Sequence, residues 1–378
     1  MLGIFVFIGL KILEPVIKIR VGKLLHDRIG HLAANTELFL RRQSRSKDSA
    51  RELHIFVTGK SANHQLLAMI KRRLHVFENR ILLKLYNSIK PYSRASKIWI
   101  DLPFETNEYD EFNNVSPQLS FTKEEEVRGT AILARMGIEN GEPFVCFHAR
   151  DKAYLDIFRP QRSREEWSYH DFRDCDINNY LSAAEYLANK EIYAIRMGAI
   201  VEKKISTMND RVIDYANCFR SDFGDIYLPS KCKFFLGNTS GNRLISTIFN
   251  VPIAFANSVP LGDIALGKND LFIPKKYWST EKKRLLTFRE IIKIGADWWL
   301  KDEMFVQADI EVIENSAEEI LALTKEMNER LEGVWFSKDE DEELQRQFRS
   351  LFPPGHRCYG FPSRIGAEFL RQNQELLR

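Results

Sequence analysis

The segment Phe144-Val145-Cys146-Phe147-His148-Ala149-Arg150-Asp151 joins four apolar residues directly to a polar, charged tetrapeptide. The apolar half is typical of a buried strand, so the charged half begins where that strand would end. Downstream, the same reasoning predicts strands at 192–195, 212–215, 233–236 and 251–256 and helices at 178–187 and 244–249. Such alternation indicates a parallel sheet covered by helices. The charged residues would then lie at its carboxyl edge, where open α/β sheets bind ligands.

The preceding residues show the same alternation. They predict strands at 53–57, 75–77 and 97–102 and helices at 31–42, 66–74, 81–89 and 123–136. A chain of 378 residues has room for two domains. We therefore expect an α/β protein of two doubly wound, Rossmann-like domains that face each other across a cleft. The expected divisions are 1–140, 141–345 and a C-terminal helical segment, 346–378, and Ser316 with Glu319 has the spacing of a capping box.

Composition and charge narrow the function classes. A content of 44% hydrophobic and 28% charged residues is that of an ordinary folded protein. The five cysteines show no C-x-x-C spacing, which argues against a zinc ribbon or a disulfide framework and favours a reducing, cytoplasmic compartment. Residues 1–100 hold 19 Lys and Arg against 6 Asp and Glu, whereas the remainder is net acidic. Residues 1–100, which we call the basic front, predict an anionic partner. Because no nucleic-acid-binding module is recognisable, we do not expect that partner to be a nucleic acid.

The amino-terminal residues leave two interpretations open. Residues 2–10 form an apolar run that is too short to cross a bilayer and lacks the basic start of a signal peptide. It could be an interfacial helix, helped by Lys11, Lys18, Arg20 and Lys23 against anionic headgroups. It could equally be a first helix or strand packed into the core.

His148 and Arg150 form the strongest candidate site. Residues two apart on an extended chain share a face, so an imidazole and a guanidinium would point together toward a ligand such as a diphosphate. The plainer alternative is that Arg150 pairs with Asp151 or Asp171. The long connection 152–176 could be a flap over the ligand. Its Asp174-Cys175-Asp176 triplet suggests a metal site, but a helix cap at Asp176 is favoured, and no metal is expected.

Two further strand ends carry candidate groups. The turn Gly237-Asn238-Thr239-Ser240-Gly241 runs straight into a helix, where backbone amides and hydroxyls could bind an anion, or where the turn could be an ordinary cap. The strand 192–195 ends in Arg196, which could reach the ligand or form a surface salt bridge.

A third candidate lies at the start of the first predicted helix. Arg28-Ile29-Gly30-His31 could present His31 as a base, with Glu37 as the competing carboxylate and Asn35 beside them. His31 could instead be a cap contact. The absence of G-x-x-x-x-G-K-[ST], H-E-x-x-H, G-x-S-x-G and G-x-G-x-x-G argues against P-loop hydrolysis, zinc proteolysis, esterase chemistry and dehydrogenation.

Taken together, these segments resemble a bacterial family of surface-polysaccharide glycosyltransferases of the two-domain GT-B type. The resemblance spans nearly the whole chain and rests on 28–38, 147–151, 170–180, 195–198, 235–241 and a closing segment near 360–377. The His-x-Arg at 148 and 150 is also similar to the motif with which GDP-fucose-dependent O-fucosyltransferases hold the donor diphosphate.

The resemblance implies transfer of a sugar from a nucleotide-sugar, with GDP or UDP as the first candidates, to a glycan or lipid-linked acceptor. It implies a donor site in the second domain, an acceptor site in the first, and neither cofactor nor metal. The expected donor-binding residues are His148, Arg150, Asp151, Arg173, Arg196, Gly237, Asn238, Thr239, Ser240 and Gly241. The expected acceptor-side residues are Arg28, Gly30, His31 and Asn35.

In this hypothesis Arg150 stabilises the leaving group and His31, or failing that Glu37, deprotonates the acceptor. The enzyme would be cytoplasmic, in peripheral contact with the inner face of the plasma membrane. Two rival hypotheses stay open: a nucleotide-sugar epimerase of the same fold, and a noncatalytic protein that binds glycan or membrane.

Overall fold

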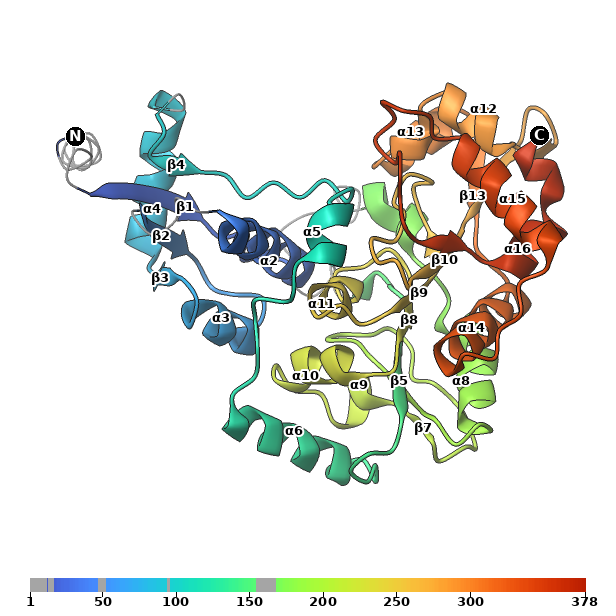
Figure 1. Cartoon of the computed structure of the whole chain (residues 1–378), viewed down its shortest axis with the longest axis horizontal. Helices are drawn as coiled ribbons and strands as arrows, with labels where there is room; N and C mark the ends of the chain where they lie inside the picture. Colours follow the sequence, from blue (N-terminus) through green and yellow to red (C-terminus); the bar gives the residue numbers. More distant parts are fainter. Residues whose placement is uncertain (1–11, 13–16, 47–51, 94–95, 154–167) are drawn as a thin grey trace.

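The computed structural model describes residues 12, 17–46, 52–93, 96–153 and 168–378 (Figure 1). The apolar run 2–10 and most of the predicted flap lie outside the described residues. The described chain forms two parallel sheets, in the order β3-β2-β1-β4 and β14-β10-β9-β8-β5-β6-β7, and a small third sheet, β12-β11-β13. The prediction of an α/β fold built on parallel sheets is therefore confirmed.

The first sheet lies entirely within the basic front. Its strands are β1 (Lys18–Lys23), β2 (Glu52–Thr58), β3 (His75–Glu78) and β4 (Trp99–Ile100). Its helices are α2 (Ile29–Arg45), α3 (His64–Lys71) and α4 (Arg80–Ile89). All three strand pairings are parallel.

Strand β1 was not predicted, because its basic residues suggested a membrane contact. They alternate with Ile19 and Val21, and the strand pairs with β2 and β4 in the middle of the sheet. The Nη2 atom of Arg20 lies 3.1 Å from Glu52 Oε1 on β2. The alternation of basic and apolar residues over 18–21 was therefore the signal of a strand. The charge of Arg20 is paired with a carboxylate on the neighbouring strand.

Five of the seven strands of the second sheet, β5 to β9, were predicted from the sequence. Its strands are β5 (Phe144–His148), β6 (Tyr193–Arg196), β7 (Val212–Ile213), β8 (Phe235–Gly237), β9 (Ile253–Ser258), β10 (Leu271–Pro274) and β14 (Arg364–Ile365). The first four residues of β5 are buried, as expected for a central strand of a parallel sheet. The apolar run of β10 was an available signal that was not used.

Helices cover this sheet and connect its strands. They are α5 (Tyr109–Asn114), α6 (Lys123–Arg135), α8 (Leu181–Ala188), α9 (Tyr215–Cys218), α10 (Gly224–Lys231), α11 (Arg243–Ile248), α12 (Phe288–Lys293), α13 (Asp302–Gln307), α14 (Ala317–Glu332), α15 (Asp339–Ser350) and α16 (Ala367–Gln372). The predicted capping box of α14 is confirmed, because the Ser316 side chain accepts from the backbone N–H of Glu319. None of the helices in the described ranges has the length and hydropathy to span a membrane.

A small antiparallel sheet was not predicted. It consists of β11 (Lys276–Ser279), β12 (Arg284–Leu285) and β13 (Ile310–Ile313). It follows β10 directly in the sequence. The second half is therefore a mixed α/β structure rather than a purely doubly wound one.

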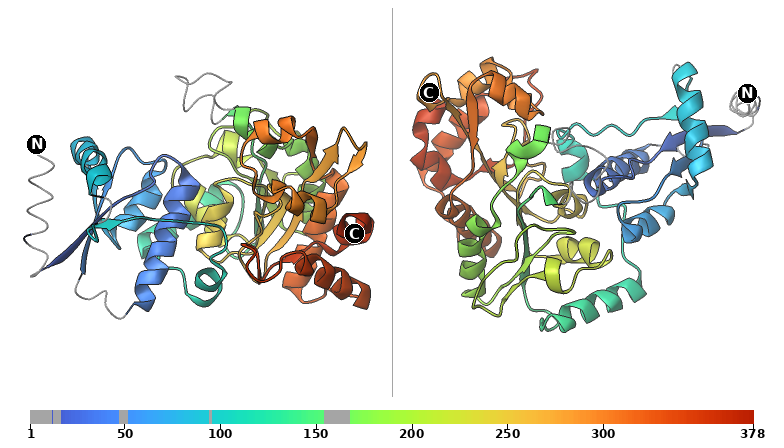
Figure 2. Two further views of the ribbon diagram at one scale, coloured as in Figure 1. Left: turned by 90° about the horizontal axis from the view of Figure 1, so that it is seen from above. Right: turned by 180° about the vertical axis from the view of Figure 1, so that it is seen from behind.

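The two large sheets share a hydrophobic cluster. Leu32, Leu66 and Ile70 from the first half pack in it with Ile245 and Ile248 from α11. Helices α2 and α11 lie side by side in both views of Figure 2. Packing between the halves is therefore part of the interior of the molecule.

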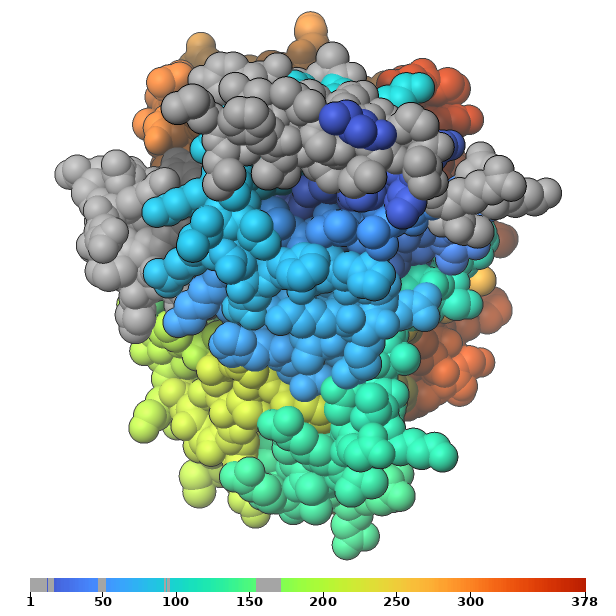
Figure 3. Space-filling view, turned by 90° about the vertical axis from the view of Figure 1, so that its left-hand side faces the viewer, coloured from blue at the N-terminus to red at the C-terminus, as the bar shows by residue number. Residues whose placement is uncertain are grey.

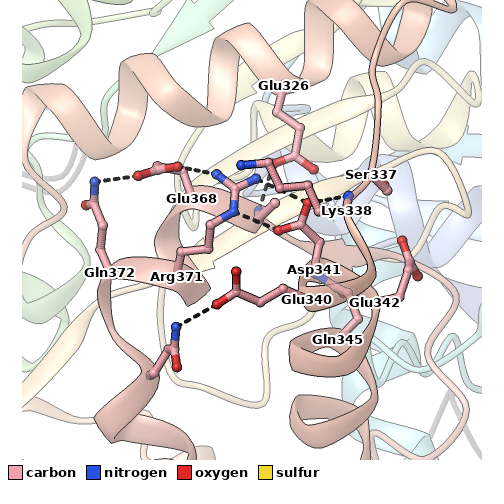
Figure 4. A network of polar contacts seen from close by, with 12 residues as sticks. Glu326, Ser337, Lys338, Glu340, Asp341, Glu342, Gln345, Glu368, Arg371 and Gln372 are labelled. Atoms are coloured by element: carbon pink, nitrogen blue, oxygen red, sulfur yellow. Dashed lines mark hydrogen bonds and ion pairs between the residues drawn. The ribbon is translucent and has the colours of Figure 1, made fainter.

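The last residues fold back onto the second sheet. Strand β14 pairs with β10, so residues 346–378 contain a strand as well as the predicted helices. Figure 4 shows how α15 and α16 are joined. The Nε atom of Arg371 on α16 donates to Asp341 Oδ1 on α15 at 2.7 Å, and the Asp341 side chain is fully buried. This pair holds the last two α-helices of the chain together.

Candidate active site

The ends of β5 and β8 lie next to each other. His148 is the last residue of β5, and its Cα pairs with that of Gly237 at the end of β8. The backbone N–H of Arg150 then donates to Asn238 Oδ1 at 3.1 Å. The structure therefore brings the His-x-Arg segment and the 237–241 turn together at the carboxyl edge of the sheet.

Arg150 forms an ion pair with Asp174, rather than with Asp151 or Asp171. Its Nη1 contacts Asp174 Oδ1, and the two side chains keep 16% and 23% of their surface exposed. Burial, together with Asp171 and Asp151, raises the pKa of Asp174 to about 7, against the opposing effect of Arg150 and Lys275. The carboxyl is therefore only partly ionised at neutral pH. Such a pair is weaker than a fully charged one.

The loop that carries Asp174 is held from two sides. The backbone N–H of Cys175 donates to the Arg150 carbonyl at 2.9 Å. The buried Lys275, which follows β10, donates from Nζ to the Asp174 carbonyl at 2.7 Å. Sequence reasoning missed Lys275 because β10 itself was not predicted. These contacts fix the position of Asp174 beside Arg150.

His148 is neutral rather than cationic. Burial lowers its pKa to about 4, and the nearby Arg196 and Arg150 guanidinium groups act in the same direction. The expected positive charge toward a diphosphate at this strand end therefore comes from Arg150, and not from the imidazole. Its Nδ1 lies 3.0 Å from the carbonyl oxygen of Met197, which fixes the orientation of the ring.

Two predicted donor-binding residues have internal roles. Arg196 is fully buried and its Nη1 pairs with Asp214 Oδ1 at 3.1 Å, so it is neither a surface pair nor accessible to a ligand. Asp151 accepts from the backbone N–H groups of Ala153 and Glu202, at 3.0 and 2.9 Å. Asp151 therefore ties the loop after β5 to the loop after β6.

The side chains of the 237–241 turn are mostly engaged within the protein. Asn238 is fully buried and donates from Nδ2 to the Arg173 carbonyl at 2.9 Å. The Thr239 hydroxyl contacts the Val259 carbonyl at 3.0 Å and Asp263 Oδ2 at 3.2 Å. These two residues build the turn instead of offering donors to a ligand. Within the described part of the chain, the buried Ser240 Oγ has no hydrogen-bond partner.

The start of α2 touches this turn directly. A Cβ atom added to Gly30 would lie 2.7 Å from the Cα of Gly241, and one added to Gly241 would lie 3.0 Å from the Gly30 backbone nitrogen. Distances this short require glycine on both sides. Arg28 is the N-cap residue of α2, two residues before this contact. The structure therefore joins the predicted acceptor side to the predicted donor side.

His31 lies on the first turn of α2, beside this contact. The residue is at an exposed position of the helix, yet partial burial of its ring lowers its pKa, and Arg28 and Arg173 act in the same direction. Its Nδ1 is 3.4 Å from Asn35 Oδ1, and the buried Asn35 donates from Nδ2 to the Leu102 carbonyl at 2.5 Å. The influence of Arg173 shows that His31 lies near the loop of the second half. Asn35 positions the ring rather than binding an acceptor.

Glu37 cannot serve as the alternative base. Its side chain is fully buried, and its Oε1 accepts from Arg41 Nε at 2.9 Å and from the Gln118 backbone N–H at 2.7 Å. Burial raises the pKa of Glu37, in spite of Arg41. An acceptor hydroxyl has no access to this carboxylate, so the prediction is wrong. The physical reason is that Arg41 and the segment at Gln118, which is distant in sequence, enclose the carboxylate.

Within the Asp174-Cys175-Asp176 triplet, Asp176 caps the helix that follows. The Asp176 side chain accepts from the backbone N–H of Asn178 at 3.1 Å, which confirms the favoured interpretation. Among the residues that the structure describes, no group of three or more His, Cys, Asp or Glu side chains could hold a metal ion.

Comparisons with known proteins give only a distant likeness. No family model matches the chain, and no curated protein sequence matches it. The chain is similar to the ADP-heptose lipopolysaccharide heptosyltransferase II of E. coli, with 13% identity, 68% of this chain and 90% of that chain covered, and a TM-score of 0.44. It is also similar to a glycosyl transferase of family 9 from Veillonella parvula, with 12% identity, 80% and 97% covered, and a TM-score of 0.45.

Proposed function

We propose that the chain is a glycosyltransferase of GT-B type that moves a sugar from a nucleotide-sugar to a glycan or lipid-linked acceptor in surface polysaccharide biosynthesis. The observation that carries this proposal is the contact between Gly30 and Gly241. It brings a histidine with a lowered pKa, His31, to the sheet edge that carries Arg150. A base and a fixed cation at one place are what sugar transfer from a diphosphate requires.

Arg150 stabilises the leaving group in this proposal. As the bond between the anomeric carbon and the diphosphate oxygen breaks, negative charge develops on that oxygen. The backbone of Arg150 is fixed by Asn238 and Cys175, so its guanidinium starts from a fixed point of the sheet edge and can lower the energy of this charge. The weak pair with Asp174 supports the assignment, because a diphosphate can replace a partly protonated carboxyl at small cost.

His31 removes the proton from the acceptor hydroxyl. The base must be neutral before reaction, and Arg28 and Arg173 help to keep it so. The contact of its Nδ1 with Asn35 leaves Nε2 to accept the proton. We propose further that the transfer needs neither cofactor nor metal, that the donor is a GDP- or UDP-linked hexose or deoxyhexose, and that the first half binds the acceptor.

The surface of the first half supports peripheral contact with an anionic membrane at the inner face of the plasma membrane. Figure 3 views the molecule from this end, where β3 and α4 face the viewer. Phe77 and Ile81 expose 51% and 69% of their surface there, beside the exposed Arg80 and Lys84. Exposed apolar side chains among basic ones are typical of surfaces that bind anionic lipid.

A thermal-shift screen of UDP-, GDP-, CMP- and ADP-sugars tests the function. A bound donor stabilises the folded state by RT ln(1 + [L]/Kd), so the true donor should raise the melting temperature by several degrees at 100 times its Kd. That donor is then used, radiolabelled, with lipid-linked acceptors. Change of the sugar without acceptor would reveal an epimerase, and no shift with any nucleotide-sugar would favour a noncatalytic glycan- or membrane-binding protein.

A further inference from the structure

The proton on His148 can be placed from its neighbour. Nδ1 lies 3.0 Å from the Met197 carbonyl oxygen, and a carbonyl can only accept a hydrogen bond. The Nδ1 atom must therefore carry a hydrogen and donate it. In a neutral imidazole the second nitrogen, Nε2, then has a lone pair and no hydrogen.

The surroundings keep the ring from taking a second proton. The charged groups that face it are Arg196, fully buried at the end of the next strand, Arg150, two residues along the chain, and Asp151. Two cations outweigh one carboxylate that is already shared between two backbone N–H groups. Burial acts in the same direction and the pKa lies at about 4, so the ring is neutral at any physiological pH.

The open nitrogen sits where a donor substrate would bind. Within the described ranges no residue hydrogen-bonds to Nε2, and the side chain is only half-buried. The oxygens of a diphosphate at neutral pH are acceptors, as is Nε2, so the two would repel each other. A hydroxyl can donate to Nε2 while the neighbouring Arg150 takes the phosphate.

We propose that His148 is a specificity-determining residue whose Nε2 accepts a hydrogen bond from a hydroxyl of the bound nucleotide-sugar, on either the ribose or the transferred sugar. This inference rests on the proposed function and divides the work of the His-x-Arg segment. Arg150 binds the negatively charged phosphate of the ligand, and His148 accepts a hydrogen bond from one of its hydroxyl groups.

The test compares three ligands by isothermal titration calorimetry: inorganic pyrophosphate, a nucleoside diphosphate and the nucleotide-sugar that stabilises the protein most. His148→Phe removes the acceptor, whereas His148→Gln places an uncharged acceptor near the position of Nε2. We expect pyrophosphate affinity to stay within about twofold in both variants. We expect the Phe variant to lose about tenfold or more for the ligand that carries the recognised hydroxyl, and the Gln variant to regain most of it.

The comparison of the three ligands shows which hydroxyl group His148 contacts. A loss already seen with the nucleoside diphosphate assigns the ribose, and a loss confined to the nucleotide-sugar assigns the transferred sugar. An equal loss for pyrophosphate would overturn the inference, because it would mean that His148 binds phosphate. If pyrophosphate bound the wild type and Arg150→Ala equally well, the proposed function itself would fail.

A spectroscopic measurement does not depend on any ligand. Only 8 histidines are present, so ¹⁵N-histidine labelling with His148→Gln as the assignment control gives the tautomer of this ring directly. We expect a neutral ring protonated on Nδ1 from pH 5.5 to pH 8. An imidazolium signal, or a proton on Nε2, would contradict the inference. His75→Gln, at an exposed position on β3, should leave both the spectrum of His148 and all affinities unchanged.

Discussion

Two arginine–carboxylate pairs, one from each half of the molecule, show how differently the same chemistry is used. Arg41 and Glu37 lie one helical turn apart on α2, and both side chains are fully buried. Arg150 and Asp174 lie at the carboxyl edge of the second sheet and remain partly exposed. The first pair is part of the interior, whereas the second keeps part of its surface exposed, which the proposed exchange with a ligand requires.

The surroundings of Arg41 explain its role. Its Nη1 donates to the Glu111 and Val115 carbonyls at 3.1 and 2.9 Å, and its Nη2 donates to the Ile248 carbonyl at 2.7 Å and to Asn250 Oδ1 at 3.0 Å. One guanidinium thus joins α2 to the end of α11. The comparison teaches that a guanidinium enclosed by backbone carbonyls of two elements holds a structure together, whereas one at a sheet edge beside a carboxyl with a raised pKa is the better candidate for a ligand contact.

The largest expected effect breaks the buried pair. Arg41→Ala leaves the Glu37 carboxylate without its partner in the interior, so we expect the free energy of unfolding to fall by about 3–5 kcal/mol in urea denaturation. Replacing both members, as Arg41→Met with Glu37→Leu, should cost less than the single change, because no unpaired charge remains. A loss below about 1 kcal/mol for Arg41→Ala would show that the pair is not structural.

Breaking the partly exposed pair of Arg150 and Asp174 should affect activity far more than stability. Arg150→Ala removes the stabilisation of the leaving group, so we expect sugar transfer to fall about 10²- to 10³-fold. The free energy of unfolding should fall by less than in Arg41→Ala, because the pair is not fully enclosed and burial raises the pKa of its carboxyl, so that a neutral Asp174 can remain. Arg346→Ala, in an exposed pair with Glu343, is the matched control and should alter neither quantity. A rate of sugar transfer by the Arg150→Ala variant equal to that of the wild type would rule out this site.

The contact between the halves gives a smaller effect. The methyl group of Gly30→Ala would overlap the Gly241 backbone, so α2 must move away from the 237–241 turn. We expect a loss of about 1–3 kcal/mol in stability from this overpacking. Transfer should fall more steeply than donor affinity, since His31 moves with α2. Unchanged transfer at reduced stability would separate α2 from the chemistry.

The smallest effect concerns the pH dependence of transfer. The base must be neutral, so activity should fall as the pH drops through the pKa of His31, which lies below its ordinary value of 6.5. Arg28 is one cause of that lowering. Arg28→Gln should therefore raise the pKa and move the acidic limb of the profile of kcat against pH to higher pH. A limb that stays in place would exclude His31 as the titrating group.

Much of the second sheet could be predicted because its signals are local. The apolar run of β5 and the alternating strands and helices after it were recognised from residues that are neighbours in the sequence. Strand β1 was missed because its basic residues were interpreted as a membrane contact. Lys275 was missed because the strand before it, β10, was not predicted. The positions of His148, Arg150 and the 237–241 turn at one edge followed from parallel topology alone.

The sequence by itself thus determined five strands of the second sheet and the polar groups that follow them, because backbone preference and apolar periodicity act over a few residues. Only the tertiary structure decided which charges are buried. Glu37 and His31 lie on the same helix, yet Arg41 and the backbone of Gln118, 81 residues further along the chain, enclose the first, whereas the second lies at an exposed position. Burial depends on what packs over a side chain, and that is set by contacts distant in sequence.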